Sequence, residues 1–152
     1  MALGDNIQVL SSSSPYGDGW FYGYPNLSAV NLNKVTTAVG RLDYGTFGAC
    51  SALVKVDLGK NLSSIDGGMF RNCTSLKKLK VPSSTKSVGD TFIDNCPSLE
   101  RLQFAEGLER IENYAFGYGN TSLKSIELPS TLSSVGIAAI NEETSAVTFN
   151  SN

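Results

Sequence analysis

The chain has 152 residues, of which 41% are hydrophobic and 17% are charged, and its formal net charge is −2. This composition is typical of a folded domain, excludes an intrinsically disordered chain and gives no global sign of binding to nucleic acid or an anionic membrane. No apolar run approaches the roughly 20 residues needed to cross a bilayer. We predict no signal peptide, since the N-terminus lacks a basic and an apolar region, which fits a cytosolic chain or one whose leader was removed.

A repeat of fixed length organises the chain. The repeat is clearest in four consecutive windows, which are Ser51–Cys73, Thr74–Cys96, Pro97–Asn120 and Thr121–Glu143. A fixed period of about 23 residues indicates stacked supersecondary units and not a single wrapped core. Because one unit cannot bury its own apolar face, most of the stability must come from contacts between neighbouring coils.

The first coil, predicted over residues 1–24, is a degenerate copy of the repeat. Counting the register backwards assigns inward positions to five residues, which are Ile7, Val9, Tyr16, Phe21 and Tyr24. Trp20 and Tyr22 are the aromatic residues of this coil that remain for the surface. Exposed aromatic rings can stack on sugars or anchor a protein partner.

Regular coils follow over residues 25–143. Each opens with apolar residues at i, i+3 and i+5, and the last two alternate with polar residues as a half-buried strand requires. These strand residues are Leu27, Val30 and Leu32, then Leu53, Val56 and Leu58, Leu76, Leu79 and Val81, Leu99, Leu102 and Phe104, and Leu123, Ile126 and Leu128. Two further apolar points lie on the far side of each coil, as at Ile65 and Phe70.

The sequence predicts a single domain over residues 1–152 with about six coils. Two segments depart from the regular repeat. The second coil carries a three-residue insertion around Arg41–Gly45. After the regular coils, Val147 and Phe149 alternate with polar residues, which predicts a terminal strand within 144–152.

Cysteine occurs once per coil, at Cys50, Cys73 and Cys96. This spacing predicts a column of small buried side chains, because unpaired cysteine is among the most buried residue types. A disulfide between neighbouring coils is an alternative, although parallel in-register side chains rarely reach the required dihedral angle. Metal binding is disfavoured, since the chain has no histidine to complete a site.

The recurring string L-x-x-L-x-L-P-x-x-L-x-x-I-G-x-x-A-F-x-x-C resembles the BspA-type, or treponemal, leucine-rich repeat. Leu123–Val135, Ile111–Phe116, Cys73 and Cys96 carry the resemblance best. The resemblance implies a right-handed leucine-rich-repeat solenoid, with a parallel β-sheet on the concave face and short turns or 3₁₀ pieces on the convex face. It also implies a cell-surface or secreted location and a role in adhesion, because many members are surface proteins of bacteria and some protists.

The outward rows of the predicted concave sheet hold six basic and three acidic residues, whereas the rest of the chain holds six basic and eleven acidic residues. We define the basic patch as Lys55, Lys77, Lys78, Lys80 and Arg101. Such a patch favours docking of an acidic protein or an anionic glycan. The alternative is a solvated face whose lysines suppress aggregation. Nucleic acid is not a predicted partner, because no aromatic residue is interleaved with the patch.

The sequence predicts a protein that is not an enzyme and needs no cofactor. Histidine, the commonest general base, is missing, and neither a GxSxG nor a GK[ST] motif is present. The main prediction is a binding module for protein–protein recognition, with cell-surface adhesion as its specialised use. The alternatives are a rigid spacer of a larger surface or virion protein, and carbohydrate binding at Trp20 and Tyr22. The oligomeric state stays open, because an uncapped end strand could pair with a second copy.

Overall fold

A computed structural model shows a parallel-strand solenoid of about five turns with a regular spacing between coils. The residues that it describes are 9–11, 19–39, 45–65, 67–142, 144 and 146–150, with the backbone alone at 9–11 and 37–39. The predicted solenoid is therefore confirmed. Two residues that we placed in the first coil, Ile7 and Tyr16, lie outside the described residues.

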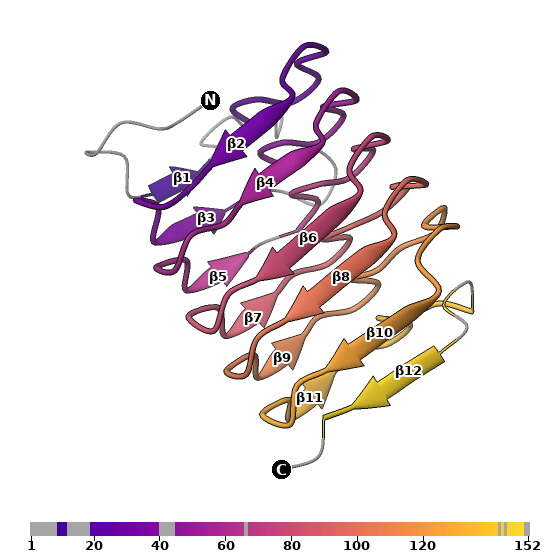
Figure 1. The fold of residues 1–152 in the computed structure, drawn as a ribbon. Helices are drawn as coiled ribbons and strands as arrows, with labels where there is room; N and C mark the ends of the chain where they lie inside the picture. Colours follow the sequence, from indigo (N-terminus) through magenta and orange to yellow (C-terminus); the bar gives the residue numbers. More distant parts are fainter. Residues whose placement is uncertain are drawn as a thin grey trace.

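One face of the stack consists of strands of three or four residues, which we call the front sheet (Figure 1). Its strands are β2 (Ala29–Asn31), β4 (Lys55–Asp57), β6 (Lys78–Val81), β8 (Arg101–Phe104), β10 (Ser125–Leu128) and β12 (Ala146–Phe149). Hydrogen bonds join β2 to β4 and connect β6, β8, β10 and β12, all in parallel. In β6, β8 and β10, exposed and buried residues alternate, as the sequence predicted for strands with one buried face.

The strand register confirms the predicted insertion in the second coil. Leu79 pairs with Leu102, which lies one regular repeat further along the chain. Val30 instead pairs with Val56. The sequence separation of these two residues exceeds the regular repeat length by the length of the predicted insertion. Residues 41–44 of the predicted insertion around Arg41–Gly45 lie outside the described residues.

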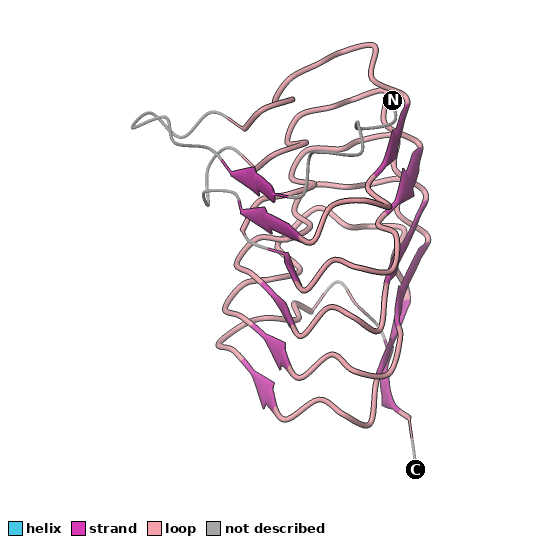
Figure 2. Cartoon of the chain, turned by 90° about the vertical axis from the view of Figure 1, so that its left-hand side faces the viewer, coloured by secondary structure: helices cyan, strands magenta, loops and turns pink. Residues whose placement is uncertain are grey.

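The opposite side of each coil carries a second parallel sheet, which we call the back sheet (Figure 2). Its strands are β1 (Val9–Ser11), β3 (Thr37–Val39), β5 (Ser64–Ile65), β7 (Ser87–Val88), β9 (Arg110–Ile111) and β11 (Ser134–Val135). Short turns lie on this side, as the sequence predicted, and no 3₁₀ turn occurs among the described residues. The short back strands that join into a sheet were not predicted. In the register of β5, β7 and β9, Ser64 pairs with Ser87 and Ser87 with Arg110, and each is followed by a branched residue.

Strand β1 corrects the register of the first coil. The sequence placed Val9 at an inward position of the front sheet, whereas Val9 pairs with Thr37 in the back sheet. The two paired residues are further apart in sequence than equivalent residues of regular coils, so the first coil is longer than the repeat. Counting back by the regular repeat length therefore assigned Val9 to the wrong side of the stack.

A column of buried apolar side chains fills the space between the two sheets. The inward residues of β6 and β8, such as Leu79 and Leu102, are at most 8% exposed, and Ile65, Val88 and Ile111 are buried on the side of the back sheet. The bends add a third set of contacts between coils, because Phe70 N–H donates to the Phe92 carbonyl at 3.1 Å. The core thus continues without interruption through the middle coils.

The three cysteines lie in this core as free, buried thiols, which confirms the predicted column. Each thiol donates a hydrogen bond to a backbone carbonyl of the preceding coil. Cys73 Sγ lies 3.1 Å from the Phe47 oxygen and Cys96 Sγ lies 3.1 Å from the Phe70 oxygen. The cysteines therefore join neighbouring coils without a disulfide.

Candidate docking surface

The basic patch lies on three adjacent strands of the front sheet. Lys55 lies on β4, Lys78 and Lys80 lie on β6, and Arg101 lies on β8, while Lys77 directly precedes β6. All five side chains are exposed, and Lys78 pairs with Arg101 in the strand register. Because neighbouring strands are about 4.8 Å apart, cations from two coils stand side by side on one face.

The described residues provide no carboxylate partner for these five cations. The ion pairs found in this part of the chain lie elsewhere, and they include Arg71–Asp94 at 3.0 Å, Lys86–Glu109 at 2.9 Å and Arg110–Glu112 at 3.1 Å. None of the ion pairs among the described residues therefore involves the basic patch. Like charges on adjacent strands are destabilising, so an anionic partner would relieve a repulsion that exists in the free protein.

Acidic residues border the patch on the same face. Asp57 and Lys80 line one hollow at the ends of β4 and β6, and Glu100, Arg101 and Glu127 line a second hollow. Asp57 is also engaged by the following turn, because its Oδ1 accepts a hydrogen bond from Gly59 N–H at 2.9 Å. A complementary partner would therefore need acidic groups at its centre and neutral or basic groups towards its edge.

The aromatic residues near the first coil are arranged differently from the prediction. Trp20 is 54% exposed, and Tyr22 is half-buried. Phe21 occupies an inward position as predicted, with its ring stacked on Phe47 at a centroid distance of 5.4 Å. The inward assignment of Tyr24 is wrong, because this side chain is 58% exposed. The equivalent position in later coils holds a cysteine, and a phenol ring is too large for that space.

No group of three or more His, Cys, Asp and Glu side chains among the described residues could hold a metal ion. Burial raises the pKa of all three thiols, that of Cys96 to about 12, so they stay protonated at neutral pH and are poor nucleophiles. The part of the chain that the structure describes also includes no helix long and apolar enough to span a bilayer.

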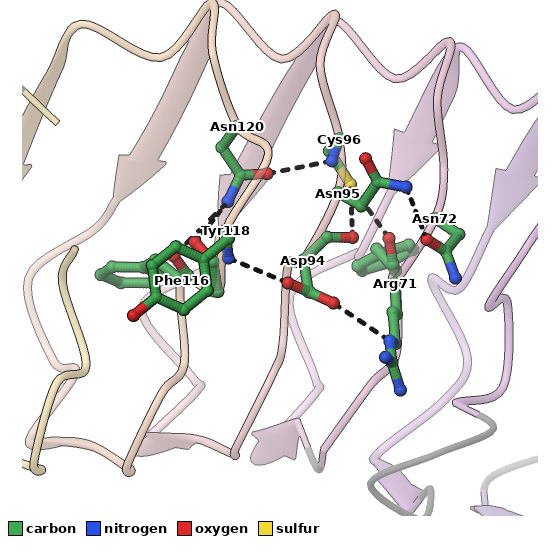
Figure 3. Close-up of polar contacts among 10 residues, drawn as sticks. Arg71, Asn72, Asp94, Asn95, Cys96, Phe116, Tyr118 and Asn120 are labelled. Atoms are coloured by element: carbon green, nitrogen blue, oxygen red, sulfur yellow. Dashed lines mark hydrogen bonds and ion pairs between the residues drawn. The ribbon is translucent and has the colours of Figure 1, made fainter. Parts of the chain in front are cut away.

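A polar cluster on the bends was not anticipated from the sequence (Figure 3). Asp94 accepts hydrogen bonds from Arg71 Nε at 3.0 Å and from Tyr118 N–H at 2.9 Å, so it links three coils. Asn95 Nδ2 donates to Asn72 Oδ1 at 2.8 Å. The available signal was the spacing of one repeat from Arg71 to Asp94 and from Asn72 to Asn95. These contacts join neighbouring coils at the bends.

Comparison with known proteins agrees with this geometry. A family model for the BspA type leucine rich repeat region matches residues 40–151 with six copies. No curated protein sequence matches the chain. Among solved structures, a leucine rich cell surface protein from Faecalibacterium prausnitzii is similar, with 24% identity and a TM-score of 0.78.

That match covers 99% of this chain and 38% of the Faecalibacterium protein, so the chain spans well under half of its length. The leucine rich repeat protein of T. pallidum is 22% identical, with a TM-score of 0.70 and coverage of 97% of this chain and 72% of that one. A leucine-rich repeat protein from Bacteroides ovatus is 20% identical, with a TM-score of 0.59 and coverage of 95% and 45%. Because the family model matches well over half of the residues, this chain belongs to the BspA-type leucine-rich repeat family.

Proposed function

We propose that this chain is a non-enzymatic binding module that recognises an acidic protein partner through the basic patch of the front sheet. The observation that carries the proposal is the grouping of five exposed cations on or next to three neighbouring strands. The repeat fold itself is consistent with a protein-binding or surface module. The positive charge of the basic patch supports an acidic protein as the class of partner.

Electrostatics and geometry support this choice of partner. A rigid face with one sign of charge raises the rate at which oppositely charged proteins meet it. The parallel coils fix the spacing of Lys55, Lys78 and Arg101, so less conformational freedom is lost on binding than at a flexible loop. The acidic residues at the border of the patch would disfavour partners whose acidic surface extends beyond its centre.

We further propose that the module acts in adhesion at a cell surface. The similar Faecalibacterium protein is described as a leucine rich cell surface protein, and its fold covers nearly all of this chain. Protease treatment of intact producing cells, followed by an immunoblot, tests the location. Loss of the band would support surface exposure, whereas a band that is protected until the cells are lysed would contradict it.

The charge-reversal variant Lys78→Glu with Lys80→Glu tests the contact. Poly-L-glutamate serves as a model acidic polypeptide, and its binding is measured by calorimetry at several salt concentrations. We expect the affinity of the unmodified chain to fall as salt rises, and the double variant to lose at least about tenfold in affinity at low salt, about 1.4 kcal/mol. Equal binding by both proteins would refute the proposed contact.

The matched control is Lys86→Glu with Arg110→Glu, which makes the same change in net charge next to and on the back sheet. Both side chains are exposed, at 57% and 60%, so their surface ion pairs contribute little to stability. We expect this variant to bind almost as well as the unmodified chain. Equal losses in the two variants would mean that net charge, and not the basic patch, governs binding.

A second candidate function is carbohydrate binding at the aromatic end of the stack. Its support is the exposure of Trp20 and Tyr24, at 54% and 58%, with Tyr22 half-buried nearby in the sequence. Trp20 is the single tryptophan of the chain, so its fluorescence reports on this site directly. Titration with heparin and with neutral oligosaccharides that leaves the fluorescence unchanged would exclude this function.

A further inference from the structure

Three cations of the basic patch form a row across the front sheet, whose strands β4, β6 and β8 lie next to one another (Figure 1). Lys55, Lys78 and Arg101 occupy the same position of these strands, one repeat apart in the sequence. Lys78 pairs with Arg101 in the strand register, and β4 is in contact with β6. The back strands of the same coils, β5, β7 and β9, form a continuous ladder, so the regular coil spacing also holds between Lys55 and Lys78. The row therefore follows the axis of the stack.

The geometry of a β-sheet fixes the spacing of this row. Neighbouring strands lie about 4.8 Å apart, so the backbone positions of Lys55 and Arg101 are about 9.6 Å apart, with Lys78 halfway between them. Lys80 follows Lys78 by two residues on β6 and therefore lies on the same outward face. The outward face of β6 thus presents two cations, whereas those of β4 and β8 present one cation each.

An α-helix that lies along the stack axis has a matching spacing. Its rise is about 1.5 Å per residue, so carboxylates at positions i and i+7 are about 10.5 Å apart, which is close to the separation of the two outer cations. Carboxylates at i+3 and i+4 lie about 4.5 Å and about 6.0 Å along the same helix, level with Lys78 and Lys80 on the middle strand. All four positions share one face of a helix.

Other acidic ligands match the row less well. Alternate side chains of an extended segment are about 6.8 Å apart, so the third acidic group would overshoot Arg101 by about 4 Å. To reach it, the basic side chains would give up rotamer freedom, which costs side-chain entropy. Val54, which precedes Lys55 and is 47% exposed, adds an apolar contact beside the row. A protein helix with acidic and apolar side chains fits this surface, whereas an anionic polysaccharide offers only the charge.

We infer that the basic patch recognises an acidic α-helix of the partner protein, with carboxylates at i, i+3, i+4 and i+7 on the face that meets the row. This inference rests on the proposed function and adds the secondary structure of the bound segment. The helix crosses β4, β6 and β8, with its outer carboxylates on Lys55 and Arg101 and its inner pair on Lys78 and Lys80. The guanidinium of Arg101 can hold a carboxylate through two parallel hydrogen bonds, which fixes that end of the helix.

The test measures binding of the full chain to three synthetic peptides of equal length and charge. The first carries glutamate at i, i+3, i+4 and i+7 in a background of alanine and glutamine, and is longer than about 15 residues because shorter isolated helices are marginal. The second distributes the same glutamates around all sides of the helix. The third keeps the spacing of the first but contains a central proline, which breaks the helix. Circular dichroism of each peptide checks its helicity.

Calorimetry at low salt should give at least about tenfold tighter binding for the first peptide, because each of the others misplaces two or more carboxylates. Equal affinities for the three peptides, with poly-L-glutamate also bound, would refute the helix and leave the acidic partner in place. Failure of poly-L-glutamate and of every peptide to bind would refute the proposed function together with this inference. The two failures are therefore distinguishable.

Variants of the chain locate the helix on the row. Lys55→Ser and Arg101→Ser should each weaken binding of the first peptide by about twofold to fivefold. Lys60→Ser is the matched control, because Lys60 is exposed in the turn after β4, outside the row, and should leave binding unchanged. A peptide with glutamine at i+7 should lose its sensitivity to one of the two row substitutions, and which one is lost gives the direction of the helix. Undiminished sensitivity to both, or an equal loss in Lys60→Ser, would contradict the assignment.

Discussion

The coil around β6 and the coil around β12 follow the same apolar pattern but differ in their surroundings. Leu79 in β6 is 2% exposed because coils cover it on both sides, whereas Val147 in β12 is 39% exposed with a neighbour on one side. A position in the repeat therefore determines the direction of a side chain, while the adjacent coils determine its burial. In a stacked-repeat protein, stability resides mainly in the interfaces.

The largest expected difference between the two coils is in the cost of truncating the core. Leu79→Ala should lower the free energy of unfolding by about 2–5 kcal/mol, because it leaves a cavity between two packed coils. Val147→Ala should cost about 1 kcal/mol or less, since much of the side chain is already in water. Urea denaturation of the two variants and of the unmodified chain measures the two losses. Equal losses would show that burial by neighbouring coils does not control stability.

The buried thiols allow a second comparison, between low and high pH. Their pKa values are raised from 9.0, that of Cys96 to about 12, mainly because burial disfavours the thiolate. The unfolded chain loses these protons first, so the stabilising contribution is complete below about pH 9 and is lost progressively as the pH rises towards 12. We expect the free energy of unfolding to fall over that range.

In the Cys96→Ala variant, the free energy of unfolding should fall less at high pH, and the difference from the unmodified chain measures the contribution of the Cys96 thiol. Thiol labelling by DTNB at neutral pH gives an independent check. The native protein should react far more slowly than protein unfolded in urea. Rapid labelling of all three thiols in the folded protein would contradict their burial.

The smallest expected effect is at Glu106, which connects the turn after β8 to the last coils. Its carboxylate accepts hydrogen bonds from Asn150 Nδ2 at 3.0 Å and from Ser130 Oγ at 3.0 Å. These hydrogen bonds lower the pKa of Glu106 below its ordinary value, so their contribution is present above that value and is lost as the pH falls through the lowered pKa.

Hydrogen exchange resolves this local contribution, because it reports opening of single segments. We expect the amides of β12 to exchange faster, relative to those of β6, in Glu106→Gln than in the unmodified chain at neutral pH. The difference should disappear in acid, where Glu106 itself is protonated. An unchanged ratio at neutral pH would mean that Glu106 does not hold β12 in place.

The residues that the sequence placed correctly are those in regular coils. Lys78, Leu79 and Lys80 alternate between water and core, and this alternation predicted both the front sheet and the rows of the basic patch. The irregular first coil was predicted less well, because a change in coil length moved Val9 to the back sheet. Tyr24 was misplaced because the register ignores whether a side chain fits its position.

Other features left too weak a signal in the sequence. Strands β5, β7, β9 and β11 have two residues each, which is too short for an alternating pattern to show. The ion pair between Arg71 and Asp94 depends on the close stacking of two bends. The role of the basic patch as a binding site stays a prediction until a partner is measured.

The direction of the backbone hydrogen bonds has a mechanical consequence. The bonds of the back sheet join each coil to the next, and those of the front sheet do so except between β4 and β6, so these bonds run along the axis of the stack (Figure 1). Tension applied along that axis would load the bonds of one interface directly and detach the coils one at a time. Each coil of about 23 residues would release about 70 Å of extended chain. A stack built in this way would lengthen in regular steps under tension, which would limit the force that it transmits.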